Sequence, residues 1–251
     1  MKAGFSSGFP FRLGSVPYLN ARPLTWTLEH AVVFRGTPNA LCKALQERQV
    51  DAALAPIVFA FQHPDFLLVD GVGIGARGPV RSVILVLEVP LDQVRTVALD
   101  PASRTSALLV RVWLEGFLGR EIRYVSRESI SDAHLWIGDP ALAVRRSLRP
   151  PRQLVDLGEV WNKITGYPFV FAVWTVRNVS GVSQLANLLR EAKDLGLARI
   201  DEITNVAEER DYLSHCIHYE LGPQEHAGIE CFLSQLRKLG IFPQTPSLTW
   251  I

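Results

Sequence analysis

The chain has 251 residues, a formal net charge of +1 and 48% hydrophobic residues, which describes a globular protein without a charge that would recruit nucleic acid or a membrane surface. No stretch reaches the length of a membrane-spanning helix, and the first ten residues lack the apolar core of a signal peptide. Three scattered cysteines indicate a reducing compartment, so we expect a cytoplasmic protein with no nucleic-acid or membrane partner, whose oligomeric state the sequence leaves open.

The first predicted strand ends at Phe11–Leu13 and runs into a turn over Gly14–Leu24, after which a helix should continue to about Glu29. The turn contains two prolines, and because proline fixes φ and lacks an amide donor, they stiffen it. Ligands of open α/β sheets bind beyond the carboxyl ends of strands. We therefore interpret the turn as a binding loop that carries three polar side chains, Ser15, Tyr18 and Asn20.

The next segments alternate between strands and helices. Strands are predicted at 31–34, 50–55 and 66–69, and Thr37-Pro38 is a typical N-cap and first residue for a helix that ends near Gln49. This alternation predicts a parallel sheet. The run Gly71–Gly75 is similar to a dinucleotide fingerprint, but no helix follows it, so we expect its glycines to permit a bend in a strand.

A second unit begins after an extended segment, 80–89. Strands are predicted at 96–100, 122–125, 133–137 and 154–157, with helices at 107–117, from Gly138-Asp139-Pro140 onward, and at 159–164. The apolar run 169–176 predicts a strand that is buried on both faces. From 182 almost to 240 the pattern is helical, with breaks near 203–205 and at 222–223.

Two α/β units joined by two extended segments match the periplasmic-binding-protein-like (type II) fold, with two lobes, two crossover strands and a central ligand cleft. We expect one lobe to contain 1–90 and 178–251, including the C-terminal helices, and the other to contain 91–177. Clefts between lobes are common ligand sites. Four polar stretches map to this cleft: the turn around Asn20, Arg81-Ser82, Ser103–Ser106 and Thr165–Tyr167.

Some of these polar residues allow two interpretations, helix capping or ligand contact. Ser103–Ser106 stands at a predicted helix start, where hydroxyls and free amides either cap the helix or also bind an anion. Asp139 is expected only to cap, and Asp100 is left open between capping and ligand contact. His215 and His218 share a helix face, but no third ligand has a suitable spacing, so we expect no metal site.

The first turn, Ser-Val-Pro-Tyr-Leu-Asn-Ala-Arg-Pro-Leu at 15–24, resembles the opening motif of the chorismate dehydratases of the futalosine route to menaquinone (the MqnA family). Further motifs of that family are matched in the same order by Asp100–Ser106, Gly138–Leu142, Asp156–Trp161 and Thr165–Ala172. The sister dihydroxynaphthoate synthases share the fold but carry Ser-Pro-Cys-Pro-Asn-Asp in the first turn, which this chain lacks. Tyr167 stands where leucine is commoner in the family, a departure that would reshape the pocket wall.

The resemblance implies a carbon–oxygen lyase that eliminates water from chorismate to give 3-[(1-carboxyvinyl)oxy]benzoate, without a cofactor. On this interpretation we expect Asn20 and Ser82 to be the catalytic residues and to hold the enolpyruvyl carboxylate, which takes the ring proton. The expected substrate-binding residues are Ser15, Tyr18, Arg81, Ser103, Thr105, Ser106, Thr165, Gly166 and Tyr167. The alternative is a non-catalytic cytoplasmic binding protein or sensor for a small anionic or aromatic metabolite.

Overall fold

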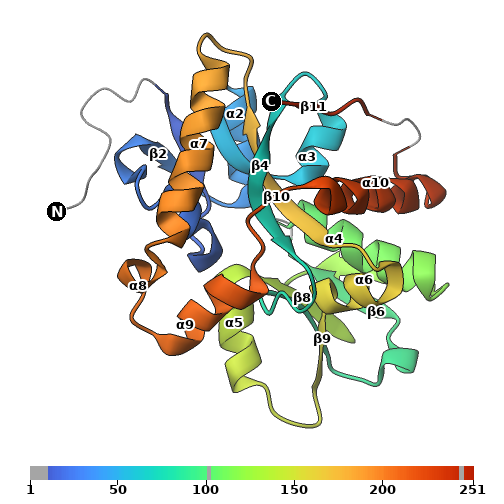
Figure 1. Ribbon diagram of the computed structural model, residues 1–251. Helices are drawn as coiled ribbons and strands as arrows, with labels where there is room; N and C mark the ends of the chain where they lie inside the picture. The colour runs from blue at the N-terminus through green and yellow to red at the C-terminus, as the bar shows by residue number, and fades with distance from the viewer. Residues whose placement is uncertain (1–10, 101–102, 243–245) are drawn as a thin grey trace. The chain divides into compact units, whose positions relative to one another are not determined.

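A computed structural model describes residues 11–100, 103–242 and 246–251 of the chain. Contacts between Cα atoms divide these residues into two compact units (Figure 1). Among the described residues, unit 1 contains 11–75, 170–222 and 246–251, and unit 2 contains 76–169 and 223–242. Each unit has a β-sheet with helices packed against it.

The sheet of unit 1 has the strand order β11-β4-β10-β3-β1-β2. Its strands are β1 (Leu13–Ser15), β2 (Val32–Arg35), β3 (Ala52–Pro56), β4 (Leu67–Ala76), β10 (Phe169–Val176) and β11 (Thr249–Trp250). As the alternation predicted, β1 pairs in parallel with both β2 and β3. β10 has the predicted bounds, is buried along almost its whole length, and pairs with β3 in the antiparallel sense.

The helices of unit 1 are mostly short. They are α1 (Arg22–Thr25), α2 (Pro38–Gln46), α3 (Ile57–Gln62), α7 (Val182–Leu197), α8 (Ile200–Ile203) and α9 (Ala207–Asp211), with the turns η1 (Leu19–Ala21), η2 (Glu29–Ala31) and η5 (Tyr212–Cys216). α2 starts as predicted, because the Thr37 hydroxyl accepts a hydrogen bond from the Ala40 amide at 3.3 Å. α1 ends before the predicted Glu29, since the chain turns after Thr25 with the Leu28 amide bonded to the Thr25 carbonyl.

The five-stranded sheet of unit 2 has the order β7-β6-β8-β5-β9. Its strands are β5 (Val83–Leu87), β6 (Thr96–Leu99), β7 (Arg123–Ser126), β8 (Ala133–Ile137) and β9 (Gln153–Asp156), and its helices are η3 (Leu91–Gln93), α4 (Arg104–Arg111), the π-helical η4 (Val112–Phe117), α5 (Gly138–Ser147), α6 (Leu157–Thr165) and α10 (Pro223–Lys238). β5 is shorter than the predicted strand 80–89, because residues 80–82 form a tight turn before it.

The expected second lobe contained 91–177, whereas unit 2 contains 76–169 and α10. The position of α10 is the largest difference, because the C-terminal helices were expected in the other lobe. Phe232 of α10 packs against Trp161 and Phe169, with ring centroids 5.8 Å and 4.9 Å apart. α10 also lies close to the backbone of Pro168, since a Cβ on Gly228 would stand 2.2 Å from the Pro168 carbonyl oxygen. This helix therefore belongs to the core of unit 2, although all of β10 and α7 precede it in the sequence.

The glycine run 71–75 lies inside β4, which agrees with the strand interpretation and not with a dinucleotide loop. Gly71 has a positive φ of 75°, and a Cβ on Gly73 would stand 2.8 Å from the carbonyl oxygen of Ala172 on β10. The glycines thus allow a bend and a close approach between strands. No helix in the described part of the chain is long and apolar enough to span a membrane.

Candidate functional site

The predicted binding loop begins at the carboxyl end of β1 in unit 1. Ser15 is the last residue of β1 and is fully buried, and its hydroxyl donates to the Val16 carbonyl at 3.2 Å. Tyr18 occupies the N-cap position of η1, and its carbonyl accepts a hydrogen bond from the Ala21 amide at 3.1 Å. Asn20 lies within η1. The three residues are therefore brought together on one ordered loop, with the Ser15 hydroxyl turned toward the backbone.

A tyrosine far along the chain holds the Asn20 loop. The Tyr219 hydroxyl donates to the Asn20 carbonyl oxygen at 3.0 Å, and Tyr219 is only 3% exposed. Its backbone is fixed in turn to β4, because the Gly73 amide donates to the Tyr219 carbonyl at 3.0 Å. Burial raises the pKa of Tyr219 well above its ordinary value, so the phenol stays protonated as a donor.

The side-chain oxygen of Asn20 differs from the other polar atoms of the loop. Asn20 Oδ1 is buried and has no hydrogen-bond partner within the described ranges 11–100, 103–242 and 246–251. A buried acceptor without a donor is costly and uncommon in folded proteins. The oxygen is thus available to a donor from outside the chain.

Arg81 and Ser82 of unit 2 form a tight turn. The Ser82 amide donates to the Val80 carbonyl at 2.7 Å, and Arg81 between them has a φ of 60°, in the region that favours glycine. The carboxylate of Asp156 accepts hydrogen bonds from the amides of Val80 and Arg81, at 3.0 Å and 2.7 Å. Ser82 is fully buried, and its carbonyl accepts a bond from the Gly138 amide at 2.8 Å.

Three of the predicted residues lie at the start of α4. Ser103 occupies the N-cap position, but its side chain makes no capping hydrogen bond. Its φ of −105° and ψ of 73° depart from the extended backbone usual for a capping residue. Ser103, Thr105 and Ser106 are each at most 5% exposed, and the hydroxyl oxygens of Ser103 and Thr105 are buried without a hydrogen-bond partner among the residues that the structure describes.

The stretch 165–167 terminates α6. The Thr165 hydroxyl donates to the Trp161 carbonyl at 2.8 Å and accepts from the Tyr167 amide at 3.2 Å. Gly166 has a φ of 74° and is the left-handed C-cap, a conformation that favours glycine. Tyr167 is 41% exposed, so its ring is accessible. The observed roles of Thr165 and Gly166 are local and structural.

The two aspartates left open or assigned as caps have other positions. Asp100 forms an ion pair with Arg127 at 2.7 Å. Asp139 does not occupy an N-cap: α5 begins one residue earlier, at Gly138, and its N-cap is Ile137, so that prediction is wrong. The positive φ of 64° at Gly138 lets the helix start directly at the end of β8.

The histidines of unit 1 do not converge. His215 Nδ1 lies 3.1 Å from Asp211 Oδ1, one turn away, and His218 pairs through its backbone with Gly75 of β4. In the described part of the chain, no three His, Cys, Asp or Glu side chains gather in a way that could hold a metal ion.

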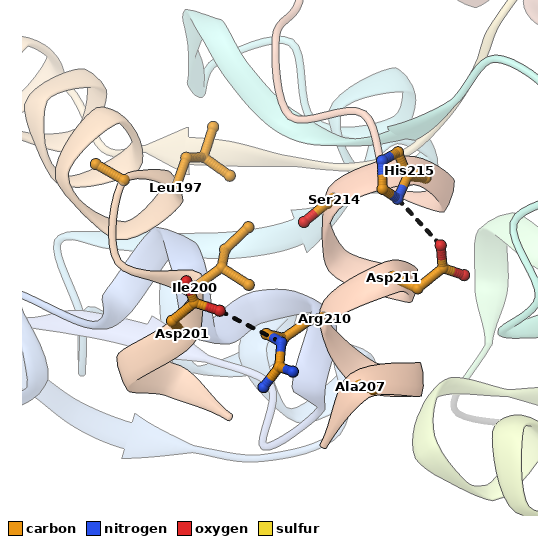
Figure 2. A pocket seen from close by; sticks show the side chains of 9 residues that line it. Leu197, Ile200, Asp201, Ala207, Arg210, Asp211, Ser214 and His215 are labelled. Carbon is orange, nitrogen blue, oxygen red and sulfur yellow. Dashed lines mark hydrogen bonds and ion pairs between the residues drawn. The ribbon is translucent and has the colours of Figure 1, made fainter. Parts of the chain in front are cut away.

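A pocket of about 490 Å³ lies between α8, α9 and the end of α7 in unit 1 (Figure 2). Arg210 forms an ion pair with Asp201 at 3.3 Å, and His215 Nδ1 lies 3.1 Å from the Asp211 carboxylate. The lining residues are Leu197, Ala198, Ile200, Asp201, Ala207, Arg210, Asp211, Ser214 and His215. None of the predicted site residues that the structure describes lines this pocket.

The sequence indicated no role for Tyr219 or Asp156. Tyr219 holds the Asn20 loop, and Asp156 holds the turn at 80–82. Tyr219 gave no signal, because its contact with Asn20 joins segments 199 residues apart. Asp156 gave a partial signal, since an aspartate three residues before Glu159 is typical of a helix start. Its carboxylate does cap α6, accepting from the Gly158 and Glu159 amides at 3.1 Å and 3.2 Å.

Comparison with solved structures identifies the fold. A protein from Archaeoglobus fulgidus is similar with a TM-score of 0.69 at 14% identity, covering 92% of this chain and 98% of that one. A Candida albicans protein described as having the generic periplasmic binding protein fold gives a TM-score of 0.62 at 12% identity, covering 95% and 97%. The periplasmic aliphatic sulphonate-binding protein of Escherichia coli gives 0.59 at 16% identity, covering 96% and 90%. The predicted periplasmic-binding-protein-like fold is confirmed.

Comparison of sequences identifies the family. A protein from Thermus thermophilus named chorismate dehydratase is 30% identical over 259 residues, covering 90% of this chain and 95% of its own length. A Campylobacter jejuni protein of the same name is 25% identical over 247 residues, covering 91% and 98%. The family described as menaquinone biosynthesis matches residues 11–238. The chain belongs to the menaquinone biosynthesis family.

Proposed function

We propose that the protein is an enzyme that eliminates water from chorismate, giving 3-[(1-carboxyvinyl)oxy]benzoate. The names of the Thermus thermophilus and Campylobacter jejuni relatives support this proposal, as does membership of the menaquinone biosynthesis family. We also infer a cytoplasmic location, which the biosynthetic relatives and the three scattered cysteines of the sequence support.

The observation that carries the proposal is the buried Oδ1 of Asn20, which has no hydrogen-bond partner in the part of the chain that the structure describes. Chorismate as a dianion offers one hydrogen-bond donor, its ring hydroxyl, while its carboxylates only accept. An amide oxygen needs a donor and an amide nitrogen needs an acceptor, so Asn20 matches a substrate that presents both groups. Because the amide is neutral, it orients these groups without repelling the dianion.

The carboxylates of the substrate need a second set of groups. At the N-terminus of the eight-residue helix α4, the Ser103 and Thr105 hydroxyls are buried, and no described part of the chain offers them a hydrogen-bond partner. Free amides and hydroxyls at a helix N-terminus bind anions. We assign these two hydroxyls, with Ser106 beside them, to a substrate carboxylate. Arg81 and the exposed ring of Tyr167 complete the proposed contacts in unit 2.

The proposed reaction is an elimination. The enolpyruvyl carboxylate removes the proton from the ring carbon that bears the ether oxygen, and the electron pair of that C–H bond forms the new ring double bond. The adjacent C–O bond breaks, and the hydroxyl leaves as water after taking up a proton. Asn20 and Ser82 hold the carboxylate and the hydroxyl in reach. Positioning of this kind accounts for roughly 7–11 kcal/mol in the best intramolecular reactions.

A turnover assay tests the function directly. Purified, metal-stripped protein is incubated with chorismate and no added cofactor, and the aromatic product is followed by absorbance and mass spectrometry. We expect steady conversion to an aromatic enol ether with loss of one water. Binding of chorismate that leaves it unchanged over hours would instead establish the protein as a non-catalytic receptor for a small anion.

Substitutions of Asn20 test the assigned role. Asn20→Ala is expected to lower turnover at least about tenfold, which is about 1.4 kcal/mol of barrier, and leave the fold intact. Asn20→Asp should be as harmful or worse, because it places a negative charge beside a dianion. Asn187→Ala, which removes a surface amide from α7 in the same unit, is the control and should retain wild-type turnover. Higher activity in Asn20→Asp would refute the role of a neutral orienting amide.

A further inference from the structure

The turn at 80–82 has an unfavourable backbone conformation, so it needs contacts from outside the turn to stabilise it. A hydrogen bond from the Ser82 amide to the Val80 carbonyl, with a φ of 60° at Arg81 between them, describes a γ-turn of the rare and strained form. Arg81 has a Cβ, so it gains nothing from the permissiveness of glycine at this φ. Strained backbone persists where surrounding contacts impose it, and it gathers at functional sites.

One buried side chain accepts hydrogen bonds from two amides of this turn. Asp156 is 4% exposed, and its Oδ2 accepts from the Arg81 amide at 2.7 Å, the shortest of its four amide hydrogen bonds. Its Oδ1 accepts from the amides of Val80, Gly158 and Glu159 at 3.0–3.2 Å. Arg145 Nη1 lies 3.7 Å from Oδ2 and supplies a positive charge. The same carboxylate thus starts α6 and fixes the turn in front of β5.

Four backbone amides donate hydrogen bonds to Asp156, so a side chain that accepts on both of its oxygens suits this position. A carboxylate accepts on both oxygens, whereas an asparagine would turn an NH₂ group toward one of these amides. With three donors at Oδ1 and one at Oδ2, an asparagine keeps its oxygen toward the helix start and faces the Arg81 amide with its nitrogen. Helix capping survives this change, because asparagine caps helices as well as aspartate does.

We propose that Asp156 is a positioning residue for Ser82, acting by holding the amides of Val80 and Arg81 in the turn that presents the Ser82 side chain. This inference rests on the proposed function, in which Ser82 holds the reacting part of chorismate. It adds a residue that does not touch the substrate, whose effect on turnover passes through the 80–82 backbone.

The test is a cycle of variants assayed with chorismate: wild type, Asp156→Asn, Ser82→Ala and the double variant. We expect Asp156→Asn to lower kcat about tenfold while KM changes less than about threefold, since a displaced Ser82 affects the reaction more than ground-state binding. In the Ser82→Ala background, Asp156→Asn should cause no further loss of kcat. A full additional loss in the double variant would overturn the proposal, because Asp156 would then act by another route.

A matched control separates positioning from general stability. Asp132 in the same unit also accepts backbone hydrogen bonds, from the Arg95 and Thr96 amides at 2.9 Å and 2.8 Å. Asp132→Asn should lower the unfolding midpoint in urea and leave kcat and KM at wild-type values. Equal losses of kcat in Asp132→Asn and Asp156→Asn would overturn the proposal.

A second variant keeps the test decisive if Asp156→Asn does not fold. A Cβ on Gly158 would stand 2.6 Å from the Gly78 carbonyl oxygen and 3.1 Å from the Val80 Cβ. Gly158→Ala therefore displaces the segment that leads into the turn and leaves Asp156 in place, and it should reproduce the loss of kcat. Wild-type kcat in Gly158→Ala would refute the role of the turn, whereas no turnover by the wild type would refute the proposed function itself.

Discussion

Tyr219→Phe removes one oxygen atom and tests how the Asn20 loop is held. Phenylalanine fills the same space, so the change creates no large cavity and its effect comes from the lost hydrogen bond to the Asn20 carbonyl. Because Tyr219 is 3% exposed, water does not readily replace the lost donor. Leaving a buried acceptor unsatisfied costs about 1–3 kcal/mol, and we expect the free energy of unfolding to fall by that amount. Turnover of chorismate should fall with it, since Asn20 loses its fixed position.

The same substitution should change how stability depends on pH. Burial, with a smaller contribution from Tyr212, raises the pKa of Tyr219 well above 10.0. A raised phenol pKa stabilises the folded state fully below the unfolded value of about 10, and this stabilisation is lost as the pH rises beyond it. The wild type should therefore lose stability between about pH 9 and pH 11. Tyr219→Phe should lose less over this range.

Urea unfolding at neutral and alkaline pH, with kcat and KM for chorismate, measures both effects. Tyr124→Phe is the control, because it removes the buried hydroxyl of a half-buried tyrosine in unit 2, whose pKa burial also raises. It should reduce alkaline sensitivity in the same way and leave turnover unchanged. If Tyr219→Phe keeps both wild-type stability and wild-type turnover, the hydrogen bond to Asn20 does not hold the loop.

Two further substitutions test the core and the acid range. Phe232→Ala should lower the free energy of unfolding, measured in urea, by about 3–5 kcal/mol, because it removes the ring that packs against Trp161 and Phe169. A decrease of less than about 1 kcal/mol would show that α10 is not part of this core. Burial of Asp51 acts to raise its pKa, but hydrogen bonds and the charge of Arg12 outweigh it, and the pKa is lowered. Asp51 therefore stabilises the fold above about pH 4 and loses this effect as the pH falls, so Asp51→Asn should reduce stability at neutral pH and flatten the acid side of the stability curve.

Local patterns predicted two strands and the start of one capped helix well. β8 and β10 have the predicted bounds because each is an apolar run flanked by residues that interrupt it. α2 begins where Thr37-Pro38 placed it. α3 was not predicted, because Ile57–Phe61 is buried on all sides and shows no helical period. The place of α10 in unit 2 depends on Phe232 meeting side chains that lie far earlier in the chain, which no local pattern records.

The sequence indicates which residues are candidates for the site, but not the contacts that they make. The polar turn after β1 and the hydroxyls at the start of α4 could be found from prolines, polar residues and strand ends. The hydrogen bonds of these residues could not be predicted from the sequence. A serine at a helix start normally caps the helix, and only the structure shows that the Ser103 side chain makes no capping hydrogen bond. The strained φ of Arg81 was also invisible, since no glycine marks the turn.

The late position of α10 constrains how the chain folds while it is being synthesised. A ribosome releases the N-terminal end first, so all strands of the unit 2 sheet emerge before Phe232 does. Until then, Trp161 and Phe169 lack the Phe232 ring that packs against them, and a nascent chain that stops after Gly222 exposes this apolar surface to solvent. Such a chain is a substrate for chaperones, and unit 2 completes its core only after β10 and α7 of unit 1 have been made.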